Sequence, residues 1–164
     1  VAANLSSKQF QDKKLLHLVI EILDENGMKP EALELEITES VLMEDPDGAA
    51  QLLEDIRGLG VRIAIDDFGT GYSSLAYLKN FPVNTLKIDQ AFITDIVHDS
   101  NDETIVASVL SMAESLNLKV VAEGVETKGQ LELLRKMGCE EVQGYYFSKP
   151  LPPEGVAALL KEKD

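Results

Sequence analysis

The sequence predicts an α/β protein in which a strand is followed by a helix six times. Short apolar segments alternate with longer segments whose apolar residues recur at helical spacing. The connections between them are short, and no linker, low-complexity tract or fixed-period repeat interrupts the order. This alternation is typical of a parallel sheet covered by helices.

The first two strand–helix units open the chain. Val1–Leu5 has strand character, and the serines that follow it are suitable N-caps for a helix over Lys8–Asn26. Leu33–Thr38 alternates apolar and acidic residues, which predicts a strand. The Asp45–Pro46 pair is typical of an N-cap and first helical position, and the helix it begins continues to Gly58.

The third unit contains an apolar segment that ends in two adjacent carboxylates. Within Val61–Leu75 a buried strand reaches Asp66 and Asp67, and a turn with two glycines follows. Adjacent carboxylates are costly to bury without a cation, and glycines let backbone N–H groups approach an anion. The stretch therefore predicts a cation site suited to phosphate chemistry. A short helix over Ser73–Asn80 and a strand over Thr85–Asp89 come next.

The rest of the chain supplies the remaining helices and strands. Ser100 and Glu103 match a capping box before a helix, and Thr127 with Gln130 forms a second match. In chain order, the segments are a helix over Ile105–Leu116, a strand over Leu118–Gly124, a helix from Thr127 that stops at Gly138, a strand over Glu141–Phe147 and a helix over Pro152–Lys161.

Two architectures fit this order, an open doubly wound sheet and a (β/α)₈ barrel. An open sheet gathers its site from two or three strands at one switch point, whereas a barrel brings all its strand ends to one mouth. Polar residues lie at or near the C-terminal ends of all six strands, so we favour the barrel, of which the chain supplies about six of eight units. These residues are Asn4, Glu36, Asp66, Asp67, Lys87, Glu123 and Gln143.

The composition excludes several partners. The formal net charge of −14 argues against binding to DNA, RNA or an anionic membrane, because all three are polyanionic. A single cysteine, Cys139, rules out an internal disulfide and fits a reducing compartment, where we expect it to serve as a small apolar residue. No apolar run approaches the length of a membrane span.

The polar set predicts a site for hard divalent cations. Any one of its carboxylates could be solvated or cap a helix, but their convergence from several strands favours a shared role. Oxygen ligands without histidine or cysteine select Mg²⁺, Mn²⁺ or Ca²⁺ over zinc or copper. Two consecutive aspartates allow one carboxylate to bridge two cations, and Lys87 is placed to activate or orient a water or to offset phosphate charge.

At this point the motifs resemble those of the EAL-domain cyclic di-GMP phosphodiesterases of bacterial signalling. They occur in the family's order and extend over the whole chain. The matching stretches are AANLSSKQF at 2–10, LELEITES at 33–40, DDFGTGYSSL at 66–75, TLKID at 85–89, VVAEGVE at 120–126 and VQGYYFSKPL at 142–151.

The resemblance implies a TIM-barrel-like domain that hydrolyses cyclic di-GMP to linear pGpG with two Mg²⁺ or Mn²⁺ ions. In it, Lys87 corresponds to the water-activating residue and Gln143 to a polar contact with a site water, and both would act beside Glu123. The implied ligands of the two ions are, for the first, Asn4, Glu36 and Asp66 and, for the second, Asp66, Asp67 and Glu123.

The resemblance also assigns a role to the loop after the aspartate pair. In this family the loop is tied to substrate binding, metal retention and dimerisation, so a homodimer through residues 68–74 is expected. Glu39 resembles the glutamate that steadies the loop, and Glu126 is a further candidate beside the metal ligands. The loop residues are Phe68, Gly69, Thr70, Gly71, Tyr72 and Ser73.

One part of the family pattern is missing from the sequence. The Glu-Ala-Leu motif, whose glutamate binds a metal ion near a phosphate-binding arginine, is expected before Val1, and the tripeptide Glu31–Leu33 lacks the motif's downstream context. We therefore expect residues 1–164 to form a partial EAL domain, without two strands and one ligand, that is weakly active or inactive alone.

Three functions stay open at this stage. The intact downstream residues favour the enzyme, a missing glutamate would favour a receptor that binds cyclic di-GMP without turnover, and a scaffold acting through protein contacts is the third. The resemblance implies a bacterial cytoplasmic location and an upstream sensory or GGDEF-type domain, in a protein that could be linked to a membrane elsewhere.

Overall fold

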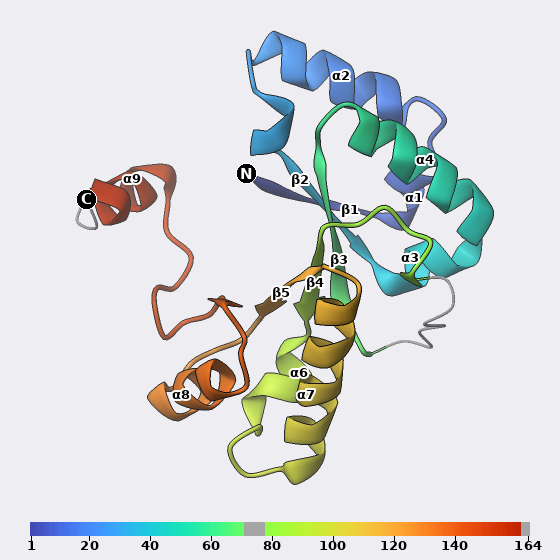
Figure 1. The fold of residues 1–164 in the computed structure, drawn as a ribbon. Coiled ribbons are helices and arrows are strands. Elements are labelled where there is room, and N and C mark those ends of the chain that lie inside the picture. Colours follow the sequence, from blue (N-terminus) through green and yellow to red (C-terminus); the bar gives the residue numbers. More distant parts are fainter. Residues whose placement is uncertain (71–77, 162–164) are drawn as a thin grey trace.

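The predicted α/β fold is confirmed by a computed structural model, which describes residues 1–70 and 78–161 (Figure 1). Its described residues form one sheet of six parallel strands that pair in chain order. A doubly wound sheet reverses its order at a switch point, so this order agrees with the barrel. The strands are β1 (Ala2–Leu5), β2 (Glu34–Thr38), β3 (Arg62–Phe68), β4 (Thr85–Ile88), β5 (Lys119–Ala122) and β6 (Glu141–Val142).

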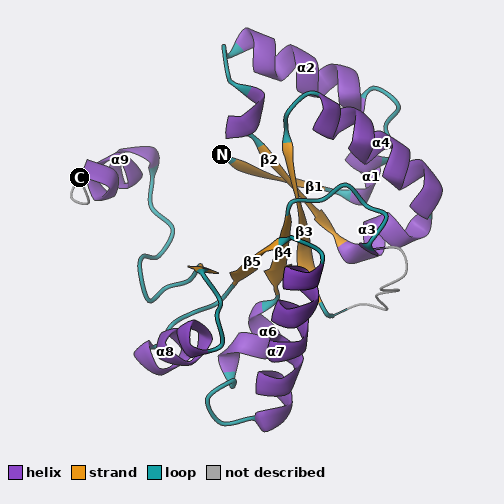
Figure 2. Cartoon of the chain, viewed as in Figure 1, coloured by secondary structure: helices purple, strands orange, loops and turns teal. Residues whose placement is uncertain are grey.

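Helices lie around the strands, which run through the centre of the chain in Figure 2. The last helix, α9, is reached by a long loop and lies apart from the others (Figure 1). The α-helices are α1 (Ser7–Phe10), α2 (Leu15–Glu25), α3 (Glu39–Glu44), α4 (Pro46–Gly58), α6 (Gln90–Thr94), α7 (Ser100–Ser115), α8 (Lys128–Lys136) and α9 (Pro153–Lys161).

The apolar core lies on one face of the sheet, and the polar side chains of the predicted site lie on the other. On β3, Ile63 and Ile65 are fully buried among core residues, and each such side chain contributes about 1.5–3 kcal/mol by leaving water. Successive side chains of a strand point to opposite faces, so Ala64 and Asp66 lie on the side away from Ile63 and Ile65. The same alternation places Lys87 of β4 on the polar face.

The single helix predicted over Lys8–Asn26 is wrong, because the chain forms α1 and α2 instead. Ser6 and Gln9 form a complete capping box around α1. The Asp12 side chain then accepts a hydrogen bond from the Lys14 N–H at 2.9 Å, and its backbone oxygen accepts one from Leu15. These local bonds start a new helix, which apolar spacing alone does not reveal.

The predicted strand over Glu141–Phe147 is also too long, since β6 ends at Val142. The chain then turns and packs against the loop after β5, where the Tyr146 N–H donates to the backbone oxygen of Val125 at 2.9 Å. Tyr145 and Phe147 are consequently exposed.

Helix starts were predicted with mixed success. The Asp45 cap and the Thr127–Gln130 capping box are confirmed. The α7 cap is Asp99 rather than Ser100, because its carboxylate accepts from the Asn101 N–H at 2.8 Å. The short helices α3 and α6 were not predicted, and most of the helix predicted over Ser73–Asn80 lies outside the described residues.

Within the described residues, no helix combines the length and apolar character that crossing a membrane requires.

Cys139 is expected to react slowly in the folded protein. The residue is 4% exposed, its thiol donates to the Glu141 backbone oxygen at 3.3 Å, and burial raises the pKa of the thiol. Little reactive thiolate therefore forms near neutral pH. Mass spectrometry after iodoacetamide treatment should find slow labelling without denaturant and fast labelling in urea. Equal rates in the two conditions would contradict the buried position.

Candidate metal centre

Lys87 lies at the centre of an acidic cluster formed by four neighbouring parts of the sheet. Its Nζ is 2.8 Å from Glu36 Oε1, 2.9 Å from Asp66 Oδ1 and 2.8 Å from Glu123 Oε1. These side chains come from β2, β3, β4 and the loop after β5. All are largely buried, with the lysine side chain 7% and the Glu123 side chain 19% exposed. The predicted convergence of strand ends is therefore observed for these residues.

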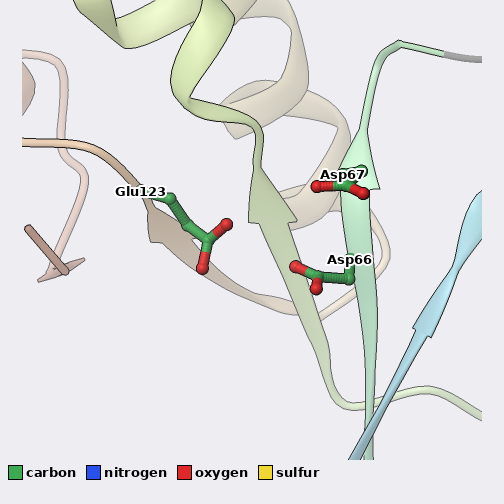
Figure 3. A group of neighbouring side chains, drawn as sticks. All are labelled: Asp66, Asp67 and Glu123. Carbon is green, nitrogen blue, oxygen red and sulfur yellow. The ribbon is translucent and has the colours of Figure 1, made fainter. Parts of the chain in front are cut away.

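An irregularity in β3 brings the two consecutive aspartates to one place. The pairing register between β3 and β4 shifts between Ile65 and Phe68, and Asp67 has a φ of 53°. In a regular strand, Asp66 and Asp67 would point to opposite faces, but a bulge re-aims one of them. Figure 3 shows both carboxylates at the end of β3, with Glu123 extending toward them from the end of β5, on the far side of β4.

These three carboxylates are close enough to hold one cation together. One oxygen from each of Asp66, Asp67 and Glu123 lies within 4.8 Å of the other two. The group contains only oxygen donors, which fits a hard divalent cation such as Mg²⁺, Mn²⁺ or Ca²⁺. The histidines stay outside it, since His17 pairs with Glu21 on the surface of α2 and His98 is exposed. The chemistry of the donor set therefore supports the predicted metal site.

The charges in the cluster are unbalanced. Burial alone would lower the pKa of Lys87, but hydrogen bonds with Glu123, Glu36 and Asp66 outweigh it and raise the pKa, so the lysine is charged. Burial raises the pKa of Glu123, and Lys87 offsets only part of this. The pKa of Asp67 is raised by burial and by the Asp66 carboxylate. One ammonium thus faces several carboxylates that a divalent cation would stabilise.

The remaining predicted residues lie around this cluster. Asn4 is exposed at the end of β1, in register with Glu36 of β2. Gln143 and Glu126 line a cavity of about 290 Å³ together with Asp67 and Glu123.

Asp89 is a site residue that the sequence interpretation missed. It lines the same cavity, and its carboxylate lies near that of Asp67 and raises the Asp67 pKa. Its carboxylate also accepts from the Ala91 N–H at 2.7 Å and caps α6. Its position two residues after Lys87, at the end of the same strand, was the available signal.

The loop after β3 is only partly described. Phe68 is buried, and Gly69 has a φ of +99° with the Phe92 ring 2.9 Å from the position of an added Cβ, so a larger residue would not fit. Thr70 Oγ1 donates to the backbone oxygen of Asp67 at 2.9 Å. The predicted loop residues Gly71, Tyr72 and Ser73 lie outside the described residues.

Glu39 begins α3 and is 5% exposed. Neither of its carboxylate oxygens has a hydrogen-bond partner among the described residues. Burying a carboxylate without hydrogen-bond partners is costly, which indicates that Glu39 has a functional role. The expected contact between Glu39 and the loop after β3 stays a prediction.

The tripeptide Glu31–Leu33 lies far from this cluster along the sheet. It follows Pro30 in a 3₁₀ turn and precedes β2, so it sits at the N-terminal end of the strand, whereas the cluster lies toward the C-terminal ends. This agrees with the interpretation that it is not the family's Glu-Ala-Leu motif.

Comparisons with known proteins agree with this arrangement. The family model described as the EAL domain matches residues 1–150. The chain is 47% identical over 161 residues to the cyclic di-GMP phosphodiesterase NbdA of Pseudomonas aeruginosa, covering 98% of the chain and 21% of that protein. The chain spans about a fifth of the length of the curated relatives it matches.

Solved structures are similar as well. The PaMucR phosphodiesterase in a c-di-GMP complex superposes with a TM-score of 0.92 at 46% identity, over 94% of this chain and 63% of that one. A manganese/cy-diGMP complex of Klebsiella pneumoniae BlrP1 gives a TM-score of 0.84 at 34% identity, over 91% and 38%. The family match, the identities and the shared fold lead to one conclusion: this chain belongs to the EAL domain family.

Proposed function

We propose that the protein containing this chain hydrolyses cyclic di-GMP to linear pGpG with the help of divalent cations. The observation that carries the proposal is the placement of Lys87 among Glu36, Asp66 and Glu123, beside the second aspartate, Asp67. The named activities and bound ligands of similar EAL proteins support the choice of substrate.

We propose a two-ion centre occupied by Mg²⁺ or Mn²⁺. Bound cations would polarise the phosphodiester and lower the pKa of a water, so that hydroxide forms near neutral pH. Asp66 is suited to bridging because it shares the Lys87 ammonium with Glu36 and also belongs to the carboxylate group with Asp67 and Glu123. We assign Asn4, Glu36 and Asp66 to one ion and Asp66, Asp67 and Glu123 to the other.

Lys87 is proposed to orient the attacking water and to offset charge on the phosphate. The lysine is charged and nearly inaccessible to solvent, and short contacts to three carboxylates hold its Nζ in place. A preorganised ammonium stabilises negative charge that develops in the transition state. Gln143 and Glu126, on the wall of the adjacent cavity, would contribute polar contacts to water or substrate.

We also propose that the chain works as one domain of a longer cytoplasmic signalling protein in bacteria. Its relatives are several times longer, which leaves room for a sensory or GGDEF-type domain. Contact of Glu39 with the loop after β3, and dimerisation through residues 68–74, would link such a domain to the site.

The direct test is hydrolysis of cyclic di-GMP by the intact protein, freed of metal by a chelator and then supplied with Mn²⁺ or Mg²⁺. Chromatography should show linear pGpG forming only after metal is added. Tight binding of cyclic di-GMP without turnover would overturn the enzyme in favour of a receptor. Absence of both binding and turnover would favour a scaffold.

A further inference from the structure

Gln130 uses its whole side-chain amide to join the end of α6 to the loop after β5. Its Oε1 accepts from the backbone N–H groups of Glu126 and Thr127, at 2.8 and 2.9 Å. Its Nε2 donates to the backbone oxygens of Ile93 and Thr94, both at 3.0 Å. The residue is 5% exposed, so water cannot readily replace these four bonds.

The two halves of the amide have different roles. The Oε1 bonds belong to the capping box at the start of α8, where a glutamate would serve equally well. The Nε2 bonds are not part of any cap of α8. They reach the Ile93 and Thr94 oxygens at the C-terminal end of α6, and the Ile93 oxygen also accepts from the Ile96 N–H at 3.4 Å.

Each partner of Gln130 lies in a segment that directly follows a site residue. Ile93 and Thr94 end α6, which follows directly from Lys87 and Asp89. Glu126 and Thr127 end the loop that begins with Glu123. The amide therefore connects the segment that follows Lys87 to the segment that follows Glu123. The Lys87 Nζ and Glu123 Oε1 atoms of these two segments are 2.8 Å apart.

The loop that carries Glu123 lies directly on α6. Gly124 has a φ of +72°, and a Cβ added there would come within 2.5 Å of the Gln90 Cβ, at the first residue of α6. The loop is thus packed against the start of α6 through Gly124 and bonded to its end through Gln130. A change in the spacing between loop and helix would move Glu123 relative to Lys87 and Asp66.

We propose that Gln130 is a positioning residue that holds Glu123 at the metal centre. The inference rests on the proposed function, because it assumes that Glu123 binds a cation. Residues that orient metal ligands typically cost 10–100-fold in metal affinity or activity when they are lost. A displacement of a site residue by about 1 Å can lower the reaction rate by a similar factor.

The variant Gln130→Glu tests this role because it keeps the capping acceptor and removes the donor. In the intact protein we expect Mn²⁺ affinity, measured by calorimetry without nucleotide, to fall about tenfold. We expect kcat for cyclic di-GMP to fall about 10–100-fold with little change in KM, while circular dichroism shows a folded protein. Should this variant fail to fold, Gln130→Met, which puts no charge in the buried position, is measured in its place.

Two control variants separate positioning from helix capping. Gln9→Glu makes the same exchange in the capping box of α1, where the described residues offer Nε2 no partner, and it should leave Mn²⁺ affinity unchanged. Thr127→Ala removes the other half of the α8 cap, whose Oγ1 accepts from the Gln130 N–H at 3.3 Å. It should lower Tm by roughly 2–6 °C and leave Mn²⁺ affinity within about twofold.

The outcomes distinguish this inference from the proposed function. Unchanged Mn²⁺ affinity and kcat in folded Gln130→Glu, or an equal loss of affinity in Thr127→Ala, would overturn the positioning role alone. If the unaltered protein bound Mn²⁺ without hydrolysing cyclic di-GMP, the proposed function would fail. The Mn²⁺ affinities of the variants would still test the positioning role of Gln130. If it bound no Mn²⁺, both proposals would fall.

Discussion

Replacing Asp66 by Asn is expected to abolish cyclic di-GMP hydrolysis, lowering kcat about 10³-fold or more, since several kcal/mol of metal-derived stabilisation would be lost. The amide has nearly the same shape but only one oxygen and no charge. Asp66 contacts Lys87 at 2.9 Å and belongs to the group of carboxylates that could share a cation. Steady-state kinetics with saturating Mn²⁺, together with calorimetry of Mn²⁺ binding, would measure both effects.

A matched control for Asp66→Asn is the same exchange at Asp24, an exposed residue of α2. That variant should retain normal rate and affinity. A rate for Asp66→Asn within tenfold of the unaltered protein, at saturating metal, would show that this carboxylate is not an essential ligand.

Replacing Lys87 by Ala is expected to abolish hydrolysis while leaving metal binding intact. The same change removes a cation that contacts three carboxylates from a position that is 7% exposed. Leaving buried charges without their partner costs about 3–5 kcal/mol, so the metal-free variant should unfold at a clearly lower temperature. Mn²⁺ should restore more stability to the variant than to the unaltered protein, because it replaces the lost positive charge.

Thermal unfolding in chelator and in Mn²⁺ measures this difference. The effect should not fall as the pH rises from neutrality to about 9, because the pKa of Lys87 is raised: its charge is complete below the ordinary lysine value and is lost only above the raised one. Lys119→Ala is the control, because its pair with Glu141 is 64% and 52% exposed and such pairs contribute about 0–1 kcal/mol. Near-normal hydrolysis by Lys87→Ala would refute the assigned role.

The polar ends of the strands could be predicted from the sequence because they obey local rules. Strand alternation and the common direction of parallel strands are enough to bring Glu36, Lys87 and Glu123 to one end of the sheet. The caps of α4 and α8 were likewise readable, since each depends on residues within three positions of one another.

The features that were not predicted depend on contacts between distant segments. The bulge that places Asp66 and Asp67 together arises where β3 pairs with β4, and strict alternation would have separated them. Gln130 was recognised as a capping residue, but its Nε2 bonds reach Ile93 and Thr94, which are 37 and 36 residues away. No pattern within one element records such pairings.

The most direct test of the metal centre is a crystal structure of the intact protein with Mn²⁺ and cyclic di-GMP, measured at the manganese absorption edge. Anomalous difference density should lie among the carboxylates of Asp66, Asp67 and Glu123, with oxygen–metal distances of about 2.0–2.3 Å. Density at another place, or none here under conditions in which the protein hydrolyses cyclic di-GMP, would contradict the account.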